Sequence, residues 1–155
     1  MTNIAKILII DNDENIRETL AMVLEQEGYI IDRAKNGKEA IMKSQSNFYN
    51  LAIVDWRLPD IEGTKLLGEL KETVPKMAKI MLTGYPSMSN AVAAVNNRAD
   101  AFFTKPVDFE LLFGKIRELL REQEEERSFS EEKVSQFIET RSKEIIQTQR
   151  LQQSQ

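Results

Sequence analysis

Residues 51–60 are Leu51-Ala52-Ile53-Val54-Asp55-Trp56-Arg57-Leu58-Pro59-Asp60, and this stretch decides the fold. A short apolar run bounded by polar and proline residues is typical of a strand that is buried on both faces of a parallel sheet. In such sheets the ligand crevice lies beyond the carboxyl ends of the strands. The sequence therefore places the carboxylate of Asp55 where a parallel sheet binds its ligands.

Two further apolar runs end in polar residues in the same way. Ile7-Leu8-Ile9-Ile10 leads into Asp11-Asn12-Asp13, and Lys79-Ile80-Met81-Leu82 leads into Thr83-Gly84. One aspartate at a strand end is a weak signal, because most such residues are solvated termini. Several polar strand ends that converge on one crevice form a much stronger candidate site.

The composition limits the class of protein. The chain has 155 residues and a net charge of −4, which fits one globular domain with some length left over. The acidic balance does not favour nucleic acid or an anionic membrane. No apolar run approaches the roughly twenty residues that a spanning helix needs, and the N-terminus lacks a signal-peptide pattern. We therefore expect a cytoplasmic protein.

The chain contains neither cysteine nor histidine. The first absence excludes disulfides, thiol catalysis and cysteine metal sites. The second excludes serine–histidine hydrolases, histidine-bound zinc and a histidine phosphodonor within this chain. The chemistry that remains uses carboxylate, hydroxyl and lysine groups.

Strand-like and helix-like segments alternate over residues 1–121, which predicts a doubly wound α/β domain. The expected strands are 6–10, a segment that starts at Tyr29, 50–54, 79–82 and 101–103. The expected helices are 14–27 with Gly28 at its C-terminal cap, one after Asn36-Gly37, one with Leu66, Leu67, Leu70 and Val74, one with Ala91, Val92 and Val95 after Tyr85-Pro86, and one with Leu112, Ile116, Leu119 and Leu120.

The composition changes at residues 122–155, which we expect to form a separate charged helical extension. Ser128-Phe129-Ser130-Glu131 matches a capping box, so a second helix could start there, although one continuous helix is equally allowed. The four-three spacing from Val134 to Gln152 is apolar at only half of its positions, which makes a poor coiled-coil seam. A linker, a dimerising or partner-binding helix and a solvated tail therefore all stay open.

From about residue 5 to residue 121 the chain resembles the response-regulator receiver domain of two-component phosphorelays. The resemblance is carried by the acidic cluster 11–13, the run from Ile53 to Gly63, Leu82-Thr83-Gly84 and Thr104-Lys105-Pro106. Each motif alone is common, but four at successive strand ends are specific. The resemblance implies a flavodoxin-like α/β fold, with a doubly wound five-stranded parallel sheet of strand order 2-1-3-4-5, followed here by the C-terminal helical extension.

The resemblance implies that Asp55 is the phosphoacceptor, because a carboxylate oxygen can attack a phosphoryl group and form an aspartyl phosphate. Lys105 and Thr83 would complete the catalytic set by binding two of the phosphoryl oxygens. Thr83 and Phe102 would form the switch, since Phe102 falls where the family carries an aromatic residue that changes rotamer. The family usually has a cis bond before the proline at position 106.

The resemblance also implies a Mg²⁺ ion between Asp55, the acidic cluster and the backbone carbonyl of Arg57, with Asp11 reaching the ion through water. Asn12 departs from the pattern, because the family usually has a second acid there that touches the metal. Asparagine keeps a carbonyl oxygen and loses a charge, so we predict weaker Mg²⁺ binding. Asp13 is either an alternative ligand or, as we favour, the cap of the first helix.

Three neighbours of the acceptor are interpreted without a catalytic role. Trp56 is expected at the rim of the site, where its fluorescence would report metal binding. Arg57, apart from its backbone carbonyl, and Asp60 are expected to be solvated.

The predicted function is a phosphorylation-switched receiver with only self-catalysed phosphoacceptance and dephosphorylation. A sensor histidine kinase or a phosphotransfer protein would be the donor. No DNA-binding domain fits in residues 122–155, so output would pass through a downstream protein, the extension, a homodimer or a domain outside this sequence. We expect no direct contact with nucleic acid or membrane.

Three alternatives compete with this function. Asn12 suggests a phosphorylation-independent scaffold with weak Mg²⁺ binding, but the retained Asp55, Thr83 and Lys105 argue against it. A phosphatase with an aspartate nucleophile would need an acid two residues after that nucleophile, where this chain has Arg57. A nucleotide-binding enzyme would need a glycine-rich loop after the first strand, and none is present.

Overall fold

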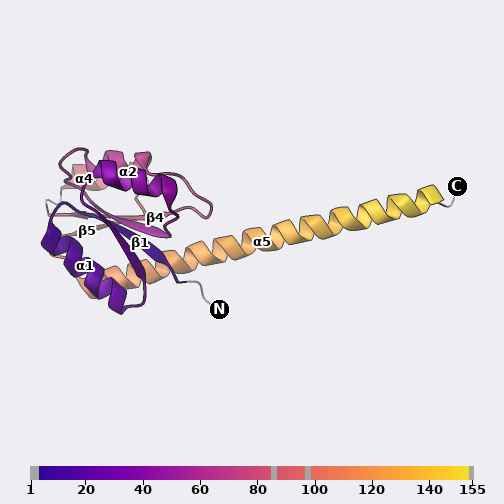
Figure 1. Ribbon diagram of the computed structural model, residues 1–155, viewed down its shortest axis with the longest axis horizontal. Coiled ribbons are helices and arrows are strands. Elements are labelled where there is room, and N and C mark those ends of the chain that lie inside the picture. The colour runs from indigo at the N-terminus through magenta and orange to yellow at the C-terminus, as the bar shows by residue number, and fades with distance from the viewer. Residues whose placement is uncertain (1–3, 85–86, 97–98, 154–155) are drawn as a thin grey trace. The chain divides into compact units, whose positions relative to one another are not determined.

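The computed structural model describes residues 4–84, 87–96 and 99–153, and Figure 1 shows their arrangement. The elements are β1 (Lys6–Ile10), α1 (Glu14–Gln26), β2 (Ile30–Ala34), α2 (Gly37–Ser46), β3 (Leu51–Asp55), α3 (Gly63–Glu69), β4 (Ala78–Thr83), α4 (Met88–Asn96), β5 (Ala101–Thr104) and α5 (Phe109–Gln153). The predicted alternation of strands and helices is confirmed. Tyr85, Pro86 and the side chain of Val95 lie outside the described residues.

All five strands are parallel, and their order is β2-β1-β3-β4-β5, as the resemblance implied. The register pairs Ile10 with Val54, and Asp55 with Leu82. Thr83 at the end of β4 is paired with Thr104 at the end of β5. The carboxyl ends of four strands therefore meet along one edge of the sheet, which is where doubly wound folds bind ligands.

Two hydrophobic clusters cover the two faces of this sheet, because successive side chains of a strand point to opposite faces. Ile53 joins the cluster that contains residues of α1 and the first turns of α5. Val54 joins the other cluster, with residues of α2, α3 and α4. Figure 1 shows α1 on one side of the sheet and α2 and α4 on the other. Every residue of β3 is buried, which fixes Asp55 on a rigid support.

The first helix has the ends that its sequence predicts. The Asp13 carboxylate accepts hydrogen bonds from the backbone N–H groups of Asn15 (2.9 Å) and Ile16 (3.2 Å), so the predicted cap is confirmed. Gly28 follows the helix with φ of 98°, a left-handed conformation that side chains disfavour.

Helix α3 is shorter than predicted. It ends at Glu69, and Leu70 is already extended, with φ of −69° and ψ of 142°. Val74 therefore does not lie on this helix, and it is 96% exposed. Pro75 disfavours the helical conformation in Val74, the residue before it, so Val74 could not have continued the helix, and the backbone has already left the helical conformation at Leu70. Leu66, Leu67 and Leu70 are buried, as the apolar pattern predicted.

The chain divides into two units, Met1–Arg121 and Glu122–Gln155. Ser128 does not start a new helix, because α5 runs without a break through this position. Large apolar side chains of the second unit are exposed: Phe129, Val134, Phe137, Ile138, Ile145, Ile146 and Leu151. Among the described helices, none has the length and apolar character needed to cross a bilayer.

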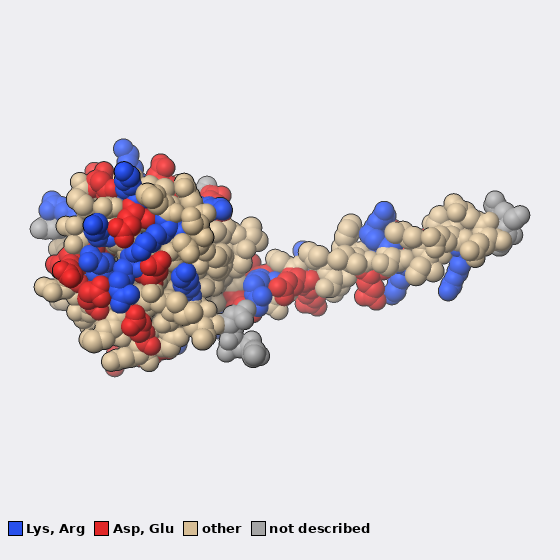
Figure 2. Space-filling view, viewed as in Figure 1, with Lys and Arg blue, Asp and Glu red and all other residues tan. Residues whose placement is uncertain are grey.

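Basic and acidic side chains are interspersed on the face of the first unit that Figure 2 shows. The contacts of this unit include ion pairs between Arg33 and both Glu18 (3.0 Å) and Glu25 (3.2 Å). Lys43 likewise pairs with Asp32 at 3.0 Å. Acidic side chains lie beside the basic ones on this face, so the positive charge is largely balanced there.

Candidate functional site

The strand ends bring the predicted catalytic residues into one cleft of about 330 Å³. Asp55 ends β3, Thr83 ends β4, and Asp11 and Lys105 directly follow β1 and β5. The complete lining is Asp11, Asn12, Asp13, Ile16, Asp55, Arg57, Thr83, Gly84 and Lys105. Every predicted metal-site residue is in this set. Phe102 is not, because it lies within β5 and packs against the cluster on the α2 side of the sheet.

Lys105 links the two buried carboxylates of the cleft. Its Nζ lies 3.0 Å from Oδ2 of Asp11 and 3.3 Å from Oδ1 of Asp55. Burial acts to lower the pKa of Lys105, but the two carboxylates outweigh burial and raise this pKa above its ordinary value. The side chain therefore stays an ammonium at neutral pH. The Lys105–Pro106 peptide bond is cis, as the resemblance implied.

Asp55 is buried, and groups of both charges surround its carboxylate. Burial, followed by the negative charge of Asp11, raises the pKa of Asp55. Lys105 and the backbone N–H of Arg57, which lies 3.4 Å from Oδ1, act in the opposite direction without cancelling the rise. Two carboxylates thus compete for one ammonium, so a further cation in the cleft would stabilise the ionised form of Asp55.

The acidic turn after β1 is held by its own hydrogen bonds. Oδ1 of Asp11 accepts from the backbone N–H of Asp13 at 2.9 Å. The guanidinium of Arg17 donates to the backbone carbonyl of Asp11 at 2.8 Å. Sequence reasoning did not single out Arg17, because its role depends on the direction of α1 relative to β1. Asn12 is exposed within the turn.

The donor groups of this cleft suit Mg²⁺. Within residues 4–84, 87–96 and 99–153, no three His, Cys, Asp or Glu side chains are grouped as metal ligands. Mg²⁺ does not require such a group, because it commonly binds one or two carboxylates and keeps several waters. Asp11 and Asp55 supply two carboxylates, while Asn12 and Arg57 bring neutral carbonyl oxygens to the same cleft.

Gly63 allows the loop after β3 to pack directly onto the acceptor strand. A Cβ at this position would lie 2.5 Å from the Asp55 carbonyl oxygen and 2.8 Å from Cα of Trp56. The N–H of Gly63 donates to the Trp56 carbonyl at 2.8 Å, and the N–H of Trp56 donates to the Leu82 carbonyl at 2.8 Å. The loop is therefore fastened to the sheet on both sides of Arg57. The Trp56 ring is half-buried against the core.

Asp60 is exposed, as predicted, but it also makes two hydrogen bonds that the sequence did not indicate. Its two carboxylate oxygens accept from the backbone N–H groups of Gly37 and Lys38, each at 2.9 Å. These two hydrogen bonds, Gly37 first, lower the pKa of Asp60 below its usual value. The exposed side chain thus connects the loop after β3 to the first turn of α2.

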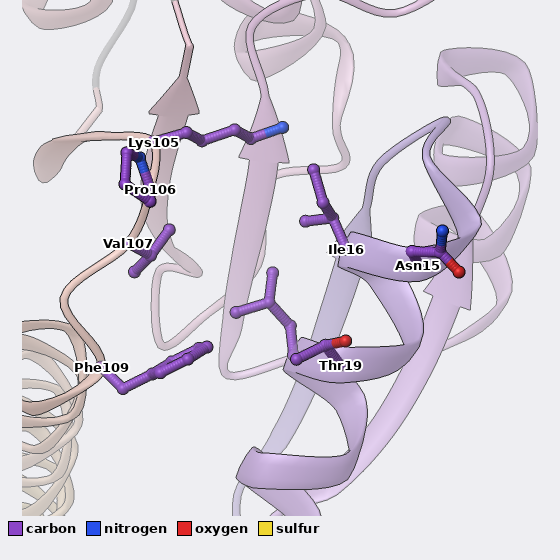
Figure 3. A pocket seen from close by; sticks show the side chains of 8 residues that line it. Asn15, Ile16, Thr19, Lys105, Pro106, Val107 and Phe109 are labelled. Carbon is purple, nitrogen blue, oxygen red and sulfur yellow. The ribbon is translucent and has the colours of Figure 1, made fainter.

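A second, more apolar groove of about 510 Å³ adjoins the cleft. Figure 3 shows Ile16 and Thr19 of α1 on one side, and Val107 and Phe109 on the segment after β5 on the other. Ile16 and Lys105 line both cavities. A molecule seated in the groove would therefore lie next to the acceptor cleft.

A parallel sheet whose strand ends gather acids, a threonine and a lysine around one buried aspartate defines a receiver-type signalling domain. The chain belongs to the response regulator receiver domain family, whose model matches residues 7–117. This is the family that the motifs indicated. Its members are two-component phosphorelay proteins and are not classical enzymes.

Curated relatives are longer proteins. The transcriptional regulatory protein GlrR of Escherichia coli (strain K12) is 32% identical over 138 residues, which cover 89% of this chain and 30% of GlrR. The response regulator ArlR of Staphylococcus saprophyticus is 33% identical over 120 residues, which cover 76% of this chain and 53% of ArlR. The chain thus spans about a third to a half of the length of these relatives.

Solved structures support the same class. A CheY-like receiver domain from Methanospirillum hungatei JF-1 is 44% identical, with a TM-score of 0.76, over 80% of this chain and 99% of that one. The response regulator TrrA of Thermotoga maritima, solved in complex with Mg²⁺-BeF, is 35% identical, with a TM-score of 0.67, over 75% of this chain and 99% of that one.

Proposed function

We propose that this chain is a phosphorylation-switched receiver in which Asp55 accepts a phosphoryl group from the phosphohistidine of a sensor histidine kinase or phosphotransfer protein in the cytoplasm. The observation that carries the proposal is the buried Asp55 carboxylate with the Lys105 ammonium 3.3 Å away. In the transfer, an oxygen of Asp55 forms a bond to phosphorus. The bond from phosphorus to the donor nitrogen breaks, and its electron pair stays on that nitrogen.

The other catalytic residues stabilise the phosphoryl oxygens. Once Asp55 carries the phosphoryl group, the Lys105 ammonium pairs with one oxygen and the Thr83 hydroxyl donates to another. Mg²⁺, when bound, supplies positive charge to the same oxygens. Asp11, Asp55, Asn12 and the Arg57 carbonyl are its proposed ligands. The helix-capping contacts of Asp13 favour a structural role over the alternative one as a ligand.

The switch consists of Thr83 and Phe102. Thr83 moves toward the phosphoryl group, and Phe102, which is half-buried beside Met81 in the register of β4 and β5, repacks in response. This is a shift between two packings that the phosphoryl group biases through its contacts in one of them. Hydrolysis of the acyl phosphate, catalysed by the receiver itself, restores the first packing.

Output passes through a protein partner that recognises the surface of α4, β5 and the start of α5. We propose the extension, residues 122–155, as a linker, a dimerising helix or a partner-binding helix, because it exposes large apolar side chains at several positions. The proposal includes no direct contact of this chain with nucleic acid or membrane.

Incubation with Mg²⁺ and acetyl phosphate tests the proposal. We expect the intact mass to rise by one phosphoryl group in the wild type and not in Asp55→Asn. Asp108→Asn is the matched control, because Asp108 is an exposed cap of α5 and asparagine caps equally well. Labelling of Asp55→Asn at the wild-type rate would refute the assignment. If the wild type gains no mass with acetyl phosphate and its Trp56 fluorescence does not change with beryllofluoride, the alternative function, a phosphorylation-independent scaffold, would be favoured.

A further inference from the structure

The loop that carries Arg57 is fastened to the start of α2. The backbone of Arg57 forms an isolated antiparallel β-bridge with that of Glu62 across this loop. Between them, Asp60 spans to α2 with both carboxylate oxygens, at 2.9 Å from the N–H groups of Gly37 and Lys38. The two groups are joined although 23 residues separate Gly37 from Asp60.

The contact serves α2 as well as the loop. The first N–H groups of a helix have no partner within the helix, and its N-terminus favours a negative charge. Asn36 satisfies the N–H of Glu39 at 2.8 Å, and Asp60 satisfies the two before it. The cap of α2 is therefore shared between a residue of its own segment and a residue of the acceptor loop.

Apolar packing fixes the same junction. A Cβ on Gly37 would overlap Cγ2 of Ile61, so the loop lies directly on the backbone at the start of α2. Ile61, Leu58 and Trp56 all pack against the cluster that includes Ala40 of α2. The loop and the first turn of α2 thus form one packed unit, and Asp60 supplies its charged contact.

We infer that Asp60 is a positioning residue for the metal site: by binding the N-terminus of α2, it holds the loop so that the backbone carbonyl of Arg57 faces the cleft. The inference rests on the proposed function, since it assigns that carbonyl as a ligand. Asp60 does not touch the metal or the phosphoryl group. It acts through Leu58 and Pro59, the two residues that connect it to Arg57, as outer partners of metal ligands generally do.

The test compares two ways of weakening the cap of α2. Asp60→Ala removes the contact to the loop, whereas Asn36→Ala removes a cap hydrogen bond of α2 and leaves the loop attached. Mg²⁺ affinity is measured by titration of the Trp56 fluorescence. We expect the Kd for Mg²⁺ to rise about tenfold in Asp60→Ala and to stay unchanged in Asn36→Ala, while both variants lose thermal stability. Asp60→Asn keeps an acceptor oxygen and should recover part of the affinity.

A second measurement needs no metal. Amide hydrogen exchange at Gly63, whose N–H is bonded to the Trp56 carbonyl, should be faster in Asp60→Ala than in either the wild type or Asn36→Ala. Equal Mg²⁺ affinity and equal exchange in Asp60→Ala and the wild type would overturn the inference about Asp60 and leave the proposed function intact. So would an equal loss of affinity in Asn36→Ala, which would make the effect one of helix stability. A wild type that binds no Mg²⁺ and accepts no phosphoryl group would instead overturn the proposed function, and the inference with it.

Discussion

Asn12 is an uncharged residue among the acids of the turn after β1, and its amide takes the place of a carboxylate beside the proposed metal site. A second acid there would add a full charge interaction, about 4 kcal/mol for unit charges roughly 4 Å apart at an effective dielectric near 20, before desolvation is subtracted. We expect Asn12→Asp to bind Mg²⁺ about tenfold more tightly, equivalent to about 1.4 kcal/mol. Fluorescence titration of Trp56 measures the change. An unchanged Mg²⁺ affinity would mean that position 12 does not reach the metal.

Gly63 is the position where a single methyl group should do most harm to the acceptor loop. A Cβ there would meet backbone atoms of Asp55 and Trp56, which cannot move without disturbing β3. We expect Gly63→Ala to lower the free energy of unfolding by about 1–3 kcal/mol and to slow phosphoryl uptake. Urea unfolding and labelling by acetyl phosphate check the two effects.

Gly68 supplies the control for that substitution. It lies on the exposed face of α3, and a Cβ added to it would meet no atom within 4 Å. Gly68→Ala should therefore leave uptake unchanged and stabilise the helix by up to about 1 kcal/mol. Equal behaviour of the two variants would contradict the steric account of Gly63.

Single residues differ in how far the sequence could predict their positions. Asp55, Thr83 and Lys105 directly end or follow strands of the parallel sheet, so the strand pattern alone placed them at one edge. Asp60 follows no such rule, because its partners at the start of α2 are chosen by the packing of a loop on a helix. The roles of Asp55, Thr83 and Lys105 in phosphoryl transfer stay predictions until the labelling experiment is done.

At the scale of the elements, a polar network connects β2, α2 and the segment before β3. Asp32 accepts hydrogen bonds from the Tyr49 hydroxyl and the Lys43 ammonium. Burial acts to raise the pKa of Asp32, but these bonds and the N–H of Arg33 outweigh it and hold the pKa below its usual value of 3.8. Burial and the same contact raise the pKa of Tyr49.

This network makes part of the stability depend on pH. Because the pKa of Asp32 is lower in the folded state, its contribution is fully present above the unfolded value of 3.8 and is lost as the pH falls through the folded value. We expect Asp32→Asn to reduce the free energy of unfolding by about 1–3 kcal/mol at pH 7. The difference from the wild type should shrink below pH 4 in urea unfolding curves. A difference that stays constant from pH 7 to pH 3 would remove Asp32 as its source.

Helix ends were harder to predict than helix positions. The leucines of α3 follow a helical spacing that Val74 continues by chance, while the chain has already left the helix at Leu70. Periodicity measures which side chains share a face, and it does not detect where a backbone stops being helical. The cap of α1 was predictable, because an aspartate before a helix satisfies N–H groups of its own first turn.

At the scale of the whole molecule, both hydrophobic clusters consist of residues up to Leu120. A chain that ends at Arg127 keeps every one of them, with almost two helical turns to protect Leu120 from fraying. We expect this shortened chain to unfold at the same temperature as the full chain to within about 2 °C, and to accept a phosphoryl group at the same rate. Circular dichroism melting and intact mass measure the two quantities.

A fall of several degrees would show that the extension contributes to the stability of the receiver. Sedimentation of the two lengths adds a second result. A mass that drops from dimer to monomer on shortening would identify the extension as a dimerising helix, whereas two monomers would leave a partner-binding helix, a linker or a solvated tail. The sequence could not choose among these, because the apolar residues of the extension follow no complete heptad pattern.

The strand order came from the family resemblance, since periodicity gives the strands of a sheet and not their neighbours. The resemblance was specific enough because it combined four motifs at four strand ends.

The cleft is lined by three acids and two basic residues, so it carries one negative charge in excess at neutral pH. Such a charge balance attracts a divalent cation and opposes the approach of a free anionic phosphodonor. We therefore expect uptake from small anionic donors to be faster once a divalent ion has entered the cleft, which labelling by acetyl phosphate with and without Mg²⁺ would measure.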